Sequence, residues 1–153
     1  MVFELYSIFA ANYSSMSIAE LFQTGERKQD ISHFRNMVMI AKSDGNISAE
    51  EVELLHKIGR EISLSDEQIK DIIKKPEDHA ITPPVSRMER FEQMVNLVQM
   101  VAADGKVEDS EMDILERIAV GIGYNDLDEV DVESILALIQ RGEDTNTIIE
   151  ELL

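Results

Sequence analysis

Apolar residues recur at the spacing of amphipathic helices along most of this chain. The pattern predicts helices over about 32–44, 48–62, 65–75 and 86–104, a helix with an apolar face over 112–122, one over about 126–141, and a short one ending at Leu153. Ser48, Ser65 and Ser86 each stand three residues before Glu or Gln, which is the spacing of a capping box. No segment shows convincing strand alternation. The pattern therefore predicts an all-α fold.

One stretch occurs twice, sixty positions apart. Residues 34–66 and 94–126 align without gaps and share nine identical positions, five of them polar or glycine. The chain then divides into a first repeat at about 32–75, a linker at 76–85 that contains three prolines, and a second repeat at about 86–141. We expect two related helical hairpins that bury their apolar faces against each other in a single domain, 16–153.

The first fifteen residues form a separate apolar extension. Residues 2–13 place apolar groups on every side, as expected for a helix that is covered all round. We expect this helix to pack on the body of the protein or to form a homodimer. The alternative is that translation normally starts at Met16.

Charge limits the classes of partner. The chain has 31 acidic and 14 basic residues, a formal charge of -17, which disfavours nucleic acid and anionic lipid and favours cations or basic protein surfaces. A well-solvated surface explains the same composition. Because there is no cysteine, disulfides, zinc–thiolate sites and thiol chemistry are excluded. No apolar run is long enough to span a bilayer, so we expect no membrane insertion and a cytoplasmic protein.

The main chemical signal is an acidic turn found in both repeats. Asp44 with Glu51, and Asp104 with Glu111, each flank a glycine turn. An aspartate in the last turn of a helix faces the negative end of the helix dipole and needs a compensating partner. That partner is either the backbone N–H groups of the next helix or a cation shared by Asp and Glu.

A self-contained calcium loop is ruled out in both copies, because its first and third positions would be occupied by side chains that cannot ligate. A composite site is the remaining metal hypothesis: the two turns pool Asp44, Glu51, Asp104 and Glu111. Such a cluster implies bound Mg²⁺ or Ca²⁺, or carboxyl groups with raised pKa values.

No catalytic motif accompanies these carboxylates, and no phosphate-binding glycine loop is present. His33, His56 and His79 lack ligand spacing and are expected at the surface or at an interface. The methionines, including Met88, are expected in the core.

The doubled sequence, an apolar helix followed by Asp-Gly-x-(Ile/Val), a Glu and a second amphipathic helix, resembles the tellurite-resistance protein B (TerB-like) family. Residues 17–134 are similar to its Bacteroidetes-type members, including Pro83-Pro84 and the Ile122-Gly123-Tyr124 ending. The resemblance implies an all-helical fold with two pseudo-symmetric halves, a role in stress response, metal binding at the four acidic positions and assembly with protein partners. Lys42 and Lys106 depart from the pattern and weaken a highly charged metal site.

Three functions follow from these observations. The first is a non-catalytic module that binds a partner protein and is tuned by Ca²⁺ or Mg²⁺. The second is a metal-dependent hydrolase or phosphotransfer accessory that uses the same carboxylates. The third is a structural homo-oligomer held by residues 2–13.

Overall fold

In the computed structural model, the residues described are 25–43 and 45–153, with side chains from Arg27 onward. This part of the chain is helical and contains no strand, which confirms the all-α prediction. The predictions for residues 1–15, for Met16 and for Asp44 lie outside the described residues. Within them, no helix has the length and apolar character needed to cross a membrane.

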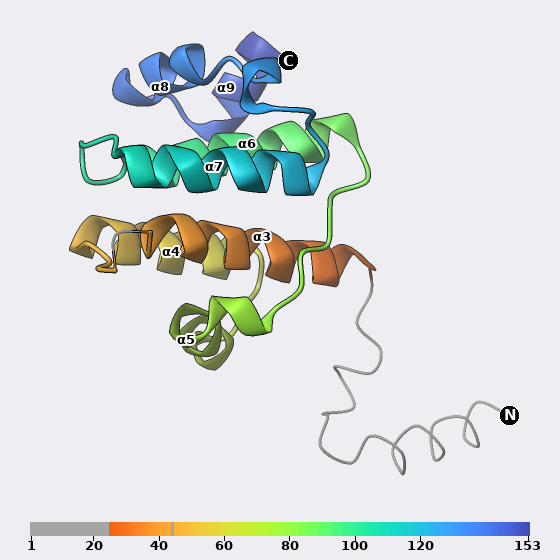
Figure 1. The fold of residues 1–153 in the computed structure, drawn as a ribbon, viewed down its shortest axis with the longest axis vertical. Helices are drawn as coiled ribbons and strands as arrows, with labels where there is room; N and C mark the ends of the chain where they lie inside the picture. The colour runs from red at the N-terminus through yellow and green to blue at the C-terminus, as the bar shows by residue number, and fades with distance from the viewer. Residues whose placement is uncertain (1–24, 44) are drawn as a thin grey trace, which may run out of the picture.

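The helices stack in layers along the longest axis of the molecule (Figure 1). In chain order they are α3 (Gly25–Ala41), α4 (Ala49–Glu61), α5 (Asp66–Lys74), α6 (Arg87–Ala102), α7 (Asp109–Ile122), α8 (Val132–Gln140) and α9 (Thr145–Leu152), with short 3-10 helices at Pro76–Asp78 and Leu127–Glu129. The two copies of the sequence repeat fall on α3–α4 and α6–α7. Helix α5 lies on the far side of these four helices from α8 and α9 (Figure 1).

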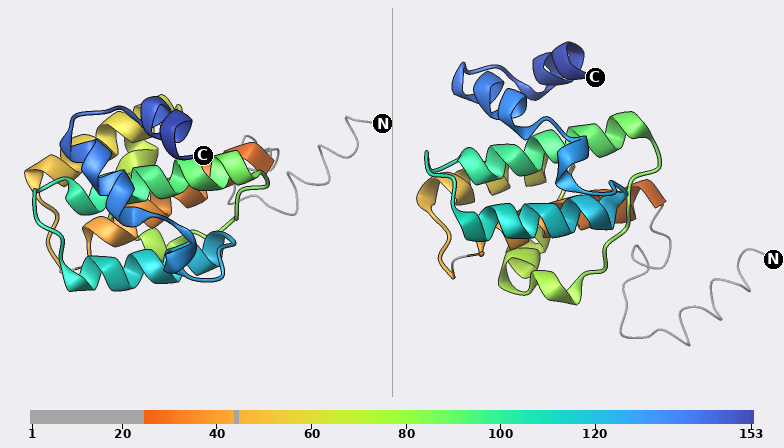
Figure 2. Two further views of the ribbon diagram at one scale, coloured as in Figure 1. Left: turned by 90° about the horizontal axis from the view of Figure 1, so that it is seen from above. Right: turned by 45° about the horizontal axis from the view of Figure 1, so that its top comes forward.

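The core forms where these layers meet. Helix α6 contacts α3, α7, α8 and α9, and helix α3 also contacts α4, α5 and α7. The fully buried side chains at these contacts include Phe34, Met37, Leu55, Met94 and Leu115. Burial of these apolar surfaces removes them from water and supplies the main favourable term for folding. In the right view of Figure 2, α6 lies between α7 and the pair α8–α9.

The helix starts follow local sequence signals. In α4, the Glu51 backbone N–H donates to Ser48 Oγ (3.1 Å) and the Ser48 N–H donates to Glu51 Oε1 (2.9 Å). Ser65 and Gln68 form the same pair of bonds at α5. These reciprocal bonds satisfy N–H groups that have no partner inside the helix, and they confirm the capping boxes predicted at Ser48 and Ser65. At Ser86, the third predicted box, the Glu89 N–H donates to Ser86 Oγ (3.0 Å), which is one of the two bonds of a box.

Two glycines occupy the turns that follow α3 and α6. Gly45 has φ +89° and Gly105 has φ +79°, a left-handed conformation that is unfavourable for residues with a Cβ atom. The turns after α3 and α6 therefore depend on glycine.

Helix α3 begins at Gly25, so the predicted start near residue 32 is wrong. The guanidinium of Arg27 donates to the backbone oxygens of Ile62 (2.6 Å) and Ser63 (2.9 Å), just past the end of α4. This contact joins the first turn of α3 to a segment 35 positions away. Helical spacing of apolar residues could not reveal it, because the first turns of α3 are polar.

Two other predictions are corrected. The helix expected over 126–141 starts only at Val132, because the Asp131 carboxylate accepts a bond from the Ser134 N–H and caps the helix there. Met88 is 59% exposed and is not a core residue. It lies in the first turn of α6, where neighbouring helices do not cover its side chain.

Candidate functional site

The two acidic turns lie at the same end of the molecule. The ends of α3 and α6 and the starts of α4 and α7 occupy that end in each view (Figures 1 and 2). The fold thus brings the two copies of the turn near each other.

Glu51 and Glu111 are the buried members of this acidic end. Each occupies the third position of its helix, and each is only 5% exposed. Glu111 Oε1 accepts a bond from the Glu108 backbone N–H (3.3 Å), and Glu51 makes the equivalent bond to Ser48. Both carboxyl groups therefore lie against the backbone at the start of their own helices, with little exposure to solvent.

The carboxyl group of Glu111 has a strongly altered proton affinity. Burial raises the pKa of Glu111 from 4.5 to about 7, against the lowering effect of the bond from Glu108. The negative charges of Glu51, Asp104 and Glu108 raise this pKa further. Since Glu51 acts on Glu111 in this way, side chains sixty positions apart in the sequence lie within electrostatic range of each other.

Asp104 behaves differently. It is exposed, and its Oδ1 accepts a bond from the Lys106 backbone N–H (3.0 Å). This is the local amide bond expected of an aspartate in a turn. In the part of the chain that is described, no three Asp, Glu or His side chains converge as a set that could hold a metal ion.

His33 was expected at the surface or at an interface, and this prediction is wrong. It is buried against α6, and its Nε2 lies 3.0 Å from the Asn96 amide nitrogen. The amide donates, so Nε2 accepts and the imidazole is neutral. Burial lowers the pKa of His33 to about 4, consistent with this form. No motif in the sequence links His33 to Asn96, which lies 63 positions later.

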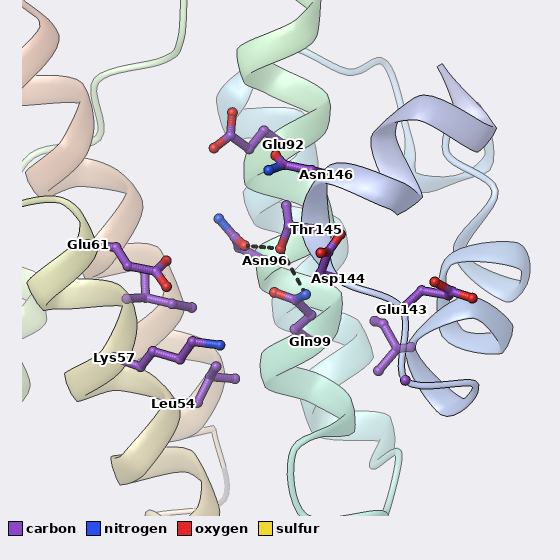
Figure 3. A pocket seen from close by; sticks show the side chains of 13 residues that line it. Leu54, Lys57, Glu61, Glu92, Asn96, Gln99, Glu143, Asp144, Thr145 and Asn146 are labelled. Atoms are coloured by element: carbon purple, nitrogen blue, oxygen red, sulfur yellow. Dashed lines mark hydrogen bonds between the residues drawn. The ribbon is translucent and has the colours of Figure 1, made fainter.

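Sequence reasoning missed a polar groove on another side of the molecule. It lies between α4, α6 and the turn that joins α8 to α9, and has a volume of about 620 Å³ (Figure 3). Among its lining residues, the Gln99 amide donates to Thr145 Oγ1 (3.0 Å), and the Thr145 hydroxyl donates to Asn96 Oδ1 (3.5 Å). Helix α9 is thereby joined to α6. The groove is assembled from three separate segments, so no short motif marks it.

Carboxylates dominate the charge of this groove. Its lining includes Glu61, Glu92, Glu143 and Asp144, with Lys57 as the one basic side chain among its lining residues. Asp144 also caps α9 by accepting a bond from the Thr147 N–H (2.8 Å).

Two of these carboxylates differ in how their charge is balanced. Glu143 has a long ion pair of 3.9 Å with the exposed Arg141. For Glu92, partial burial and then the charges of Glu89 and Asp30 raise the pKa. Negative charge on Glu92 is thus unfavourable in the protein as it stands.

Comparison of the chain with protein-family models, with curated proteins and with solved structures found no match.

Proposed function

We propose that this protein is a non-catalytic helical module that binds a partner protein and responds to a divalent cation at its acidic end. In this proposal α3–α4 and α6–α7 are the two pseudo-symmetric hairpins of a TerB-like domain with a role in stress response. The single observation that supports it is that Glu51 and Glu111, one from each copy of the repeat, are both buried and that the charge of Glu51 raises the pKa of Glu111.

Two buried carboxylates within range of each other repel when both are ionised. A shared proton or a bound cation relieves that repulsion, and carboxylate oxygens are the ligands that Ca²⁺ and Mg²⁺ prefer. The raised pKa of Glu111 indicates that the pair already holds a proton near neutral pH. A cation at this pair would have to displace that proton, with Asp104 and Asp44 as the remaining candidate ligands.

The hydrolase alternative requires the same carboxylates around an open pocket that admits a substrate. The groove described above is lined by a different set of side chains. The acidic end therefore supports a regulatory or structural role better than a catalytic one.

Calorimetric titration with Ca²⁺ and Mg²⁺ tests the cation part of the proposal. We expect binding that weakens from pH 8 to pH 6, because protons compete with the cation for carboxylates. The double variant Glu51→Gln/Glu111→Gln should lose the binding heat, and the control double variant Glu67→Gln/Glu77→Gln, which removes two exposed charges, should retain it. Absence of heat with the unmodified protein would remove the cation from the proposal.

A further inference from the structure

We propose that the groove between α4, α6 and the α8–α9 turn binds an extended basic segment of a partner protein. The inference rests on the proposed function in one respect, that the protein works by binding other proteins. It concerns a different surface from the acidic end and does not depend on a cation.

Charge is the first argument for this occupant. Four carboxylates and one ammonium group line the groove, and the whole chain carries a formal charge of -17. The field of Glu89 and Asp30 adds to that of Glu92 on the α6 side. An arginine or lysine placed against Glu92 would offset this repulsion, so its charge would be worth more here than on an ordinary exposed surface.

The polar side chains that line the groove provide the second argument. Asn96, Gln99 and Asn146 line it (Figure 3). The Asn96 amide is already bonded to His33 and Thr145, and the Gln99 N–H₂ group donates to Thr145. The Gln99 oxygen and the exposed Asn146 amide are therefore the groups that can pair with the N–H and C=O groups of an extended backbone. In a helical peptide the backbone N–H and C=O groups bond to each other, so they would not be available to the amide side chains of the groove.

Size and sign exclude other occupants. The volume of about 620 Å³ falls within the range of pockets that accept small ligands, so it can hold a few residues but no folded domain. Nucleic acid is repelled by the carboxylates. A free polyamine shares the cationic chemistry and can donate to amide oxygens, but unlike a peptide backbone it has no C=O group to accept a bond from the amide N–H groups.

The test uses a short fluorescent peptide of alternating arginine and glycine, with the full chain, at low salt and in the presence of a metal chelator. Fluorescence anisotropy should report saturable binding that weakens as salt is added. Spermine serves as the competitor. Because the chelator removes metal from every sample, a negative result in this assay would not depend on whether the acidic end binds a cation.

Two triple variants locate the site. Each replaces three partly or fully exposed acidic residues by their amides, so both change the net charge equally, and thermal unfolding checks that both remain folded. The groove variant is Glu61→Gln/Glu92→Gln/Glu143→Gln, and the control on α5 and the following turn is Glu67→Gln/Asp71→Asn/Glu77→Gln. We expect about tenfold weaker peptide binding for the groove variant, from three pairs each of modest energy, and less than twofold for the control.

One substitution should act in the opposite direction. Lys57→Gln removes the groove's basic side chain and should tighten peptide binding about twofold to threefold, whereas Lys70→Gln on α5 should have a smaller effect. In NMR spectra the side-chain amide signals of Asn96, Gln99 and Asn146 should shift on addition of the peptide.

Three results would overturn the inference. The first is no saturable binding at low salt. The second is equal loss of binding in the two triple variants, which would indicate general attraction to an acidic surface. The third is full competition by spermine with the same amide shifts, which would assign the groove to a small polyamine.

Discussion

Replacement of Glu111 by glutamine is the sharpest test of the buried acidic pair. Glutamine keeps the shape of the side chain and its amide oxygen can still accept the Glu108 N–H. The protein itself provides the precedent, because Gln68 makes this bond at the third position of α5 (3.0 Å). The substitution thus removes the charge and preserves the cap.

The magnitude follows from the pKa of Glu111. Ionisation of this group is harder in the folded protein, where its pKa is about 7 instead of 4.5. At about 1.4 kcal/mol per pKa unit, this difference sets an upper limit of about 3 kcal/mol on the destabilisation caused by the charged form. Asp104 and Glu108 are exposed, so solvent screens their part of the effect. We therefore expect the variant to be more stable than the unmodified protein by about 1–2 kcal/mol at pH 8.

The pH dependence has a definite sign. The folded state holds the proton of Glu111 more tightly than the unfolded state, so this group lowers stability as the pH rises from about 4.5 through about 7. His33 acts in the opposite sense, because its lowered pKa makes the folded state lose stability as the pH falls from 6.5 through about 4. The two slopes overlap, and His33 is common to both proteins. Its contribution cancels in the difference between them.

Urea denaturation at a series of pH values between 4 and 8.5 measures this difference. The gain in stability from Glu111→Gln should be near zero at the acid end and should level off above pH 7. Glu67→Gln is the control, because Glu67 is exposed in the first turn of α5 and its substitution should give a nearly flat difference. A variant that is less stable than the unmodified protein at pH 8, or a difference independent of pH, would refute the reasoning.

Three further predictions concern packing, capping and titration. Gly59→Ala should lower the free energy of unfolding, measured by urea denaturation, by about 1–3 kcal/mol, because the new Cβ atom would lie 2.7 Å from Ile69 Cδ1. Gly121→Ala is the control, since its Cβ atom would have its nearest contact at 3.7 Å and the change should be neutral or stabilising. Equal effects of the two substitutions would contradict this. Asp144→Ala should remove the cap of α9 and lower the melting temperature, and an unchanged melting temperature would contradict this role. The imidazole C–H signals of His33 should not titrate in NMR between pH 7 and pH 5.5, and a midpoint near 6.5 would show that the ring is solvated.

Much of the fold could be predicted because its signals are local. The capping boxes at Ser48 and Ser65 and the glycine turns at Gly45 and Gly105 depend on residues within a few positions of one another. Helix α3 was placed too late because its start depends on Arg27 and on a contact with the end of α4. Such a contact leaves no trace in the spacing of apolar residues.

The candidate sites show the same limit. The repeat indicated that Glu51 and Glu111 play equivalent parts, but their burial depends on how α4 and α7 pack, and the sequence carries no record of that. His33 was misassigned because its partner, Asn96, lies 63 positions away. The groove was missed for the same reason, since α4, α6 and the α8–α9 turn become neighbours only in the folded protein.

The bonds from Arg27 have a mechanical consequence. They join the start of α3 to the end of α4, and the turn at Gly45 connects the same two helices at their other ends. We therefore expect the amide hydrogens of α3 and α4 to exchange with solvent as one cooperative unit. Helix α9 has Ile148 as its one buried side chain and should exchange first. Part of the groove lining therefore belongs to α9, the helix expected to open most easily. A ligand bound in the groove should slow deuterium uptake in residues 145–152.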